Sequence, residues 1–204
     1  MKPKIISVIG APRSGKSFLA KKLAGKLNYE IILEGENGEF PAFIKDDIKN
    51  KTNGIRRTLW FRNKQLTNFL NAVDLQKQGQ GSILDTFWID YQMYVDVLLA
   101  GEDREIINDL ISIDRRNNAW PDIIIYLKNT EEGTKKFIEI ANDRDFDKDG
   151  GFYESQIAPL QKKYEEIINL APPSVKLIIV ERENLDFERE DDLEKVINLI
   201  KETK

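Results

Sequence analysis

The sequence predicts an α/β fold of three layers, in which helices cover both faces of a five-stranded parallel sheet. Two observations predict it. Short β-branched runs alternate with longer segments of helical periodicity, an order that is typical of parallel sheets. In addition, the first apolar run is followed directly by a glycine-rich loop and then by leucines at helical spacing. A chain of 204 residues with 41% hydrophobic content has the size of one domain.

The first half of the chain alternates between short strands and helices. A β-branched strand over 5–9 precedes a helix over 17–27, whose leucines share one face. A second short strand, 30–33, leads to Glu34. Glycine, asparagine and charged residues then predict a loop with one short helix. Apolar side chains at helical spacing predict a long helix over 56–78.

The second half continues this order. The run SILD at 82–85 predicts the third strand, and helical patterns fill most of 88–115. The most strand-like run is DIIIYL at 122–127, and a last strand follows over 175–180. Further helices are expected over 131–141, 153–170 and 191–201. We therefore expect a single domain over 1–204 with a small lid at about 142–156.

The composition excludes several kinds of chemistry. The chain has no cysteine and no histidine, so thiolate chemistry and the usual general base are absent. Lys and Arg total 31 against 35 Asp and Glu, which disfavours binding of a nucleic acid polymer. No segment approaches the ~20 apolar residues of a membrane span. We expect a cytoplasmic protein that acts on a small molecule, with a homodimer left open.

The loop after the first strand matches the phosphate-binding pattern G-x-x-x-x-G-K-[ST], with Gly10, Gly15, Lys16 and Ser17 in the required positions. Backbone N–H groups of such a loop point at phosphates, and the helix that follows adds a partial positive charge. The motif predicts a P-loop NTPase fold and ATP as ligand. The residues expected to bind ATP are Gly10, Arg13, Ser14, Gly15, Lys16, Ser17 and Phe18.

Two other interpretations of this loop are open from the sequence. It could be a glycine turn between a strand and a helix, with an exposed lysine. The letters PRSG also resemble the phosphosulfate-binding loop of sulfotransferases, but that loop does not normally continue with Lys-Ser, and those enzymes usually rely on a histidine.

Carboxylates at the ends of the second and third strands predict the chemistry beside the loop, because ligands of such sheets bind beyond the carboxyl ends of the strands. Asp85 is expected to hold Mg²⁺ together with the hydroxyl of Ser17, directly or through water. Glu34 is expected to accept the proton of an attacking hydroxyl. A turn cap at Asp85 and a solvated loop at Glu34 are the alternatives. Asp122 precedes its strand and lies at the opposite end.

The ordered set of motifs resembles the deoxyribonucleoside kinases, within the nucleotide-kinase-like P-loop proteins. The resemblance rests on the P-loop, Glu34, the helix with RNKQL at 62–66, the strands SILD and PDIIIYL, and a lid with Arg144. It implies that Glu34 is the catalytic base, that Lys16, Ser17 and Asp85 serve ATP and Mg²⁺, that Arg144 acts on the transferred phosphoryl group, and that Arg62 faces the substrate.

The chain departs from the family pattern at three positions. Thr86 replaces the arginine that usually follows the acidic residue of the third strand, and Ile55 replaces a glutamine that reads the nucleobase. Asp90 lies one residue before the position of the acidic partner, which is Tyr91 here. These departures indicate either a different acceptor, such as another small hydroxyl or phosphate compound, or a loss of catalytic power, and the missing arginine favours the nucleotide-binding sensor.

The lid and the aromatic residues add two hypotheses. Asp145, Asp147 and Asp149, followed by Gly150, match the start of a calcium-binding loop, although the twelfth position is Gln156 in place of glutamate. A solvated acidic lid is the alternative. Trp60 and Trp88 could line an aromatic substrate slot, and a place in the core is the alternative.

Together these patterns predict an ATP-dependent phosphotransferase that uses Mg²⁺ and acts on a small hydroxyl-bearing acceptor, a (deoxy)nucleoside in the first instance. A nucleoside monophosphate kinase and a nucleotide-binding sensor without catalytic activity are the alternatives.

Overall fold

The computed structural model describes residues 3–35, 40–141 and 157–202, without the side chains of 138–141. It contains a five-stranded sheet in the order β2-β3-β1-β4-β5, with every neighbouring pair parallel. The strands are β1 (Ile5–Gly10), β2 (Glu30–Ile32), β3 (Ser82–Leu84), β4 (Ile123–Lys128) and β5 (Lys176–Glu181). The predicted α/β class and the parallel sheet are confirmed.

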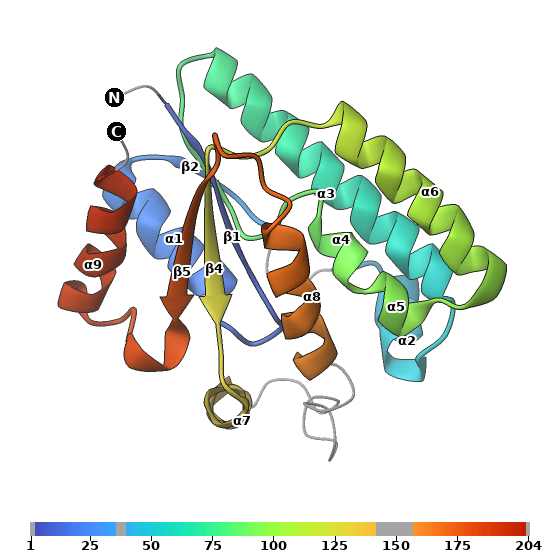
Figure 1. Cartoon of the computed structure of the whole chain (residues 1–204). Coiled ribbons are helices and arrows are strands. Elements are labelled where there is room, and N and C mark those ends of the chain that lie inside the picture. The colour runs from blue at the N-terminus through green and yellow to red at the C-terminus, as the bar shows by residue number, and fades with distance from the viewer. Residues whose placement is uncertain (1–2, 36–39, 142–156, 203–204) are drawn as a thin grey trace.

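Helices cover both faces of the sheet, as Figure 1 shows. One face packs against α1 (Lys16–Leu27) and α9 (Glu190–Lys201), and the other packs against α3 (Gly54–Lys77) and α8 (Ala158–Ile168). β1 and β4 are buried on both faces, so their β-branched runs contribute to both clusters of the core. The short helix in the loop after β2 is α2 (Ala42–Asn50).

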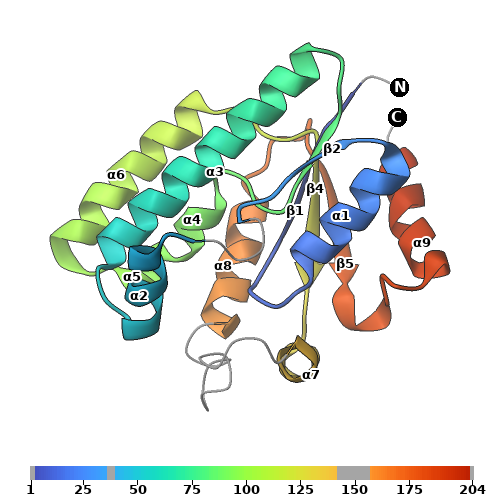
Figure 2. The same ribbon diagram turned by 180° about the vertical axis from the view of Figure 1, so that it is seen from behind.

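The region predicted as largely helical over 88–115 is divided into three helices. These are α4 (Asp90–Met93), α5 (Val95–Leu98) and α6 (Gly101–Asn117). The break between α5 and α6 occurs because Leu99 and Ala100 are extended and Gly101 has a φ of 56°. Seen from behind in Figure 2, α6 lies along α3 on its outer side, where Ile107 and Ile111 pack near Ile55 and Phe61.

The two ends of the sheet have different polar groups. At the amino end, Asp122 accepts hydrogen bonds from the backbone N–H of Ile5 at 2.7 Å and from Nε2 of Gln76 at 2.7 Å. This contact confirms that Asp122 lies away from the predicted site. At the carboxyl end the chain forms the P-loop, the turn after β3 and α7 (Glu131–Ala141) (Figure 1). The predicted lid lies outside the described residues.

Candidate active site

The P-loop has the backbone conformation that its glycines allow. Gly10 and Gly15 have φ values of 152° and 87°, which side chains with a Cβ rarely adopt. A Cβ on Gly10 would lie 2.7 Å from the carbonyl oxygen of Leu127 on the neighbouring strand. Gly15 caps α1, so the loop ends at the positive end of that helix. The sequence therefore folds here into a cradle suited to phosphate.

The other loop residues predicted to bind ATP surround this cradle. Arg13 has a positive φ of 67°, Ser14 is buried with an Oγ that lacks a hydrogen-bond partner among the described residues, and Phe18 is 40% exposed on α1. The ammonium group of Lys16 folds back over the loop, where Nζ donates to the carbonyl oxygens of Gly10 at 2.8 Å and Ala11 at 3.2 Å. Its charge is thus held at the cradle.

Ser17 and Asp85 meet directly, although 68 residues separate them in the chain. Oγ of Ser17 donates to Oδ2 of Asp85 at 2.6 Å. Hydroxyl and carboxylate oxygens are hard ligands of the kind that Mg²⁺ prefers, alongside phosphate oxygens and water. The two predicted metal ligands therefore fit the ion.

Glu34 lies on the other side of Asp85. Its backbone N–H donates to Oδ1 of Asp85 at 2.8 Å, and its Oε1 accepts a hydrogen bond from Nε2 of Gln65 at 2.6 Å. The pKa of Glu34 is raised from 4.5 to about 7. Burial is the largest cause, the negative charges of Asp85 and Asp90 act in the same direction, and the Gln65 hydrogen bond and Lys16 oppose them. A carboxyl group with this pKa can take up and release a proton near neutral pH.

A buried carboxyl group, that of Asp90, lies close to Glu34. Asp90 accepts hydrogen bonds from the N–H of Phe87 at 2.8 Å and from the hydroxyl of Tyr164 on α8 at 2.7 Å. Burial is the largest cause that raises the pKa of Asp90 to about 6. The acidic residue that departs from the family position by one residue thus belongs to the polar network of the site.

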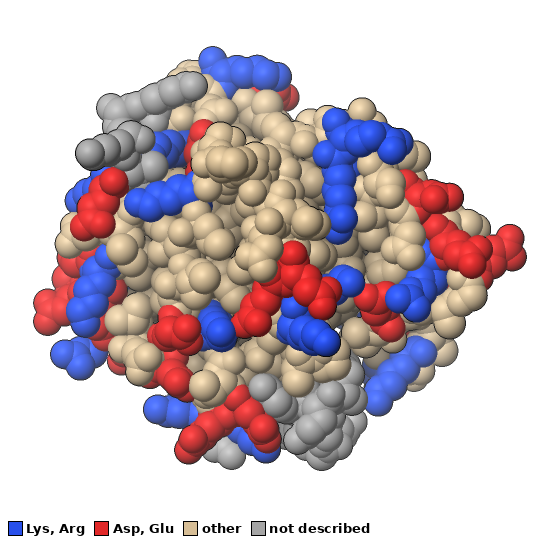
Figure 3. Space-filling model, in the orientation of Figure 1, with Lys and Arg blue, Asp and Glu red and all other residues tan. Residues whose placement is uncertain are grey.

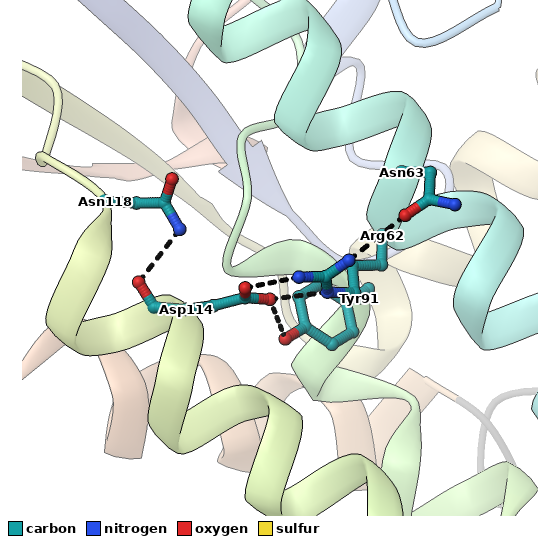
Figure 4. Close-up of polar contacts among 5 residues, drawn as sticks. All are labelled: Arg62, Asn63, Tyr91, Asp114 and Asn118. Carbon is teal, nitrogen blue, oxygen red and sulfur yellow. Dashed lines mark hydrogen bonds and ion pairs between the residues drawn. The ribbon is translucent and has the colours of Figure 1, made fainter.

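Arg62, predicted to face the substrate, is paired with a carboxylate of the neighbouring helix α6. Its Nε and Nη2 form a bidentate ion pair with Asp114 of α6, at 2.7 and 2.5 Å, and the hydroxyl of Tyr91 donates to the same carboxylate at 2.6 Å (Figure 4). Asp114 is buried, and its ion pair with Arg62 joins α3 to α6. The reason is that a buried carboxylate needs a cation and hydrogen-bond donors.

The two tryptophans predicted for a substrate slot have different environments. Trp88 is fully buried, its Nε1 donates to the carbonyl oxygen of Ala119 at 2.6 Å, and its ring packs against Phe87 and Trp120. It therefore belongs to the core, and its substrate assignment is wrong. Trp60 borders a pocket of about 500 Å³ together with Glu34. Its ring also packs edge-on against Phe40 at 5.5 Å.

Several predicted residues lie outside the described part of the chain, namely Arg144 and the possible calcium ligands Asp145, Asp147 and Asp149. Within the described part, Figure 3 shows acidic and basic side chains interspersed on the face it presents.

Two residues of the site were not identified from the sequence. Gln65 is buried on α3, and its spacing of three residues from the buried Asn68 is the signal that could have placed these two polar side chains on one buried face. Arg182, directly after β5, lies beside Gly15 with its guanidinium 4.4 Å and 4.3 Å from the rings of Phe137 and Phe187. No pattern around Arg182 indicates this position.

Known proteins with this architecture define the class of fold. A structure of deoxyadenosine kinase from M. mycoides with the products dCMP and a flexible dCDP, and one with dCTP bound, each match with a TM-score of 0.76 at 20% identity, covering 97% of this chain and 98% of theirs. A structure with dATP bound matches at 0.73 and 19% identity. No protein-family model matches the sequence, and no curated protein does so either.

These similarities establish the fold: the chain has the fold of deoxynucleoside kinase-like P-loop kinases. The resemblance inferred from the ordered motifs is thereby confirmed at the level of architecture.

No helix in the described ranges is long and apolar enough to cross a membrane.

Proposed function

We propose that this protein is a kinase that transfers the γ-phosphoryl group of ATP to the hydroxyl of a (deoxy)nucleoside. The observation that carries the proposal is the position of Glu34, which Asp85 links to Ser17 of the P-loop. The carboxylate of Asp85 therefore contacts both the proposed general base and the P-loop. Kinase neighbours that bind deoxynucleotides support the same class of substrate.

The chemistry needs little covalent work by the protein. Glu34 takes the proton of the acceptor hydroxyl, and the oxygen then forms a bond to the γ-phosphorus. Lys16 and the backbone N–H groups of the loop hold the phosphates in position. Ser17 and Asp85 would hold Mg²⁺, which offsets charge on the phosphate oxygens when bound. The bond between the γ-phosphorus and the bridging oxygen breaks, and ADP leaves.

A neutral acceptor fits the charges on α3. Arg56 pairs with Asp47 at 2.7 Å and Arg62 pairs with Asp114 at 2.5 Å, so both arginines already have carboxylate partners. A nucleoside monophosphate would bring further negative charge that needs a cation. Arg57 supports this second candidate, because it is half-buried and its Nε has no hydrogen-bond partner among the described residues.

Coupled ADP release with Mg²⁺ and ATP tests the proposal. Wild type, Lys16→Ala and the control Lys21→Ala, which alters an exposed lysine of the same helix, are compared with nucleosides, nucleoside monophosphates and no acceptor. Turnover that requires a nucleoside and is lost only in Lys16→Ala supports the proposal. Turnover that requires a monophosphate, and is weakened by Arg57→Ala, supports the second candidate. ATP binding without acceptor-dependent turnover contradicts both and indicates a nucleotide sensor.

A further inference from the structure

The side chain of Gln65 bridges two groups of fixed hydrogen-bonding character. Its Oε1 accepts from the backbone N–H of Tyr91 at 2.8 Å, and its Nε2 donates to Oε1 of Glu34 at 2.6 Å. A backbone N–H can only donate, so the carbonyl side of the amide must face Tyr91. The NH₂ side must then face Glu34. Because Gln65 is 2% exposed, water does not offer it other partners.

The backbone of Glu34 is held independently of its carboxyl group. Its N–H donates to Asp85, and Nδ2 of Asn68 donates to the carbonyl oxygen of the preceding Leu33 at 3.1 Å. These two contacts fix the backbone that follows β2 between Asp85 and α3. What remains to be set is the rotation of the carboxyl group, and among the described residues Gln65 donates a hydrogen bond to it.

We propose that Gln65 is a positioning residue that selects which oxygen of Glu34 accepts the proton of the substrate. The carbonyl oxygen of a protonated carboxyl group accepts a hydrogen bond better than its hydroxyl oxygen does, so the N–H of Gln65 favours the state in which Oε1 stays unprotonated. The proton of the acceptor hydroxyl therefore goes to Oε2. The acceptor oxygen bonds to the γ-phosphorus as the phosphorus separates from the bridging oxygen, whose electron pair leaves with ADP.

This inference rests on the proposed kinase activity. It also explains why the side chain that donates to Glu34 is an uncharged amide. Among the described residues, the titratable groups that act on Glu34 are Asp85, Asp90, Tyr164 and Lys16. Gln65 orients the carboxylate without adding a full positive charge to this set. Thr86 stands at the position where the family usually has an arginine, and its Oγ1 is buried without a hydrogen-bond partner among the described residues.

The kinetic test is a double-mutant cycle between positions 65 and 34. Gln65→Glu keeps an acceptor for the Tyr91 N–H but replaces the donor that faces Glu34. We expect kcat to fall about 10- to 100-fold, with the acceptor KM changed by less than about threefold. In a Glu34→Gln background, the same change should alter the residual kcat by less than about twofold. Equal losses in both backgrounds would overturn the proposal, because a purely structural effect is additive.

Two further measurements complete the test. Gln78→Glu makes the same substitution at an exposed glutamine just after α3 and should leave kcat unchanged. The side-chain NH₂ signal of Gln65 in a ¹H–¹⁵N spectrum, assigned by its loss in Gln65→Leu, should shift and exchange faster in Glu34→Ala. A signal that Glu34→Ala leaves unchanged would overturn the contact. If wild type shows no acceptor-dependent turnover, the proposed function fails, and the NH₂ signal still decides whether Gln65 holds Glu34.

Discussion

Glu34→Gln should make the protein more stable while removing its general base. In the folded protein burial raises the pKa of Glu34 from 4.5 to about 7, so the fold disfavours the charged form. This shift corresponds to a ceiling of about 3 kcal/mol of lost stability at pH 8. Because Glu34 is half-buried and not fully buried, we expect about 1 to 3 kcal/mol. The amide introduced by the substitution keeps an oxygen that accepts from Gln65 and carries no charge.

The pH dependence gives the sign of the effect. Below pH 4.5 Glu34 is protonated in both the folded and the unfolded chain, so the penalty is absent. It grows as the pH rises from 4.5 and is complete above the folded pKa of about 7. The free energy of unfolding of wild type should therefore fall, relative to that of Glu34→Gln, across this window.

Urea denaturation of both proteins between pH 4.5 and pH 8 measures the difference. Glu30→Gln is the matched control, because Glu30 is an exposed carboxyl group at the start of β2, the strand that precedes Glu34. A Glu34→Gln variant that is no more stable than wild type at pH 8, or a difference that does not change with pH, would refute the reasoning.

Three further predictions concern Glu34, Asp85 and Arg62. With the acceptor identified by ADP release, kcat/KM should fall about tenfold per pH unit below the pKa of about 7, and the slope should be absent in Glu34→Gln; a pH-independent wild-type profile would exclude Glu34 as the base. Asp85→Asn should raise the Mg²⁺ concentration needed for half-maximal turnover by at least about tenfold, and a Mg²⁺ titration with unchanged midpoint would argue against this site. Arg62→Ala should destabilise the fold by about 3 to 5 kcal/mol, because it leaves Asp114 buried without its cation, and the acceptor KM should stay near that of wild type in the fraction that remains folded.

The sequence was informative wherever function depends on neighbours along the chain. The P-loop could be predicted because its glycines, Lys16 and Ser17 are consecutive and their spacing sets the backbone path. The parallel sheet could be predicted because β-branched runs alternate with helices. Glu34 and Asp85 could be placed at one edge because both follow strands of that sheet.

Tertiary structure alone decided which distant side chains meet. Arg62 pairs with Asp114, 52 residues away, and no local pattern indicates this contact. Trp88 lies in the core, and Gln65 bridges Glu34 and Tyr91. Periodicity predicts which face of a helix is buried, but the partner of a buried polar group depends on how the helices pack. Local patterns therefore determined the fold and the phosphate cradle, whereas packing decided the surroundings of the carboxylate beside it.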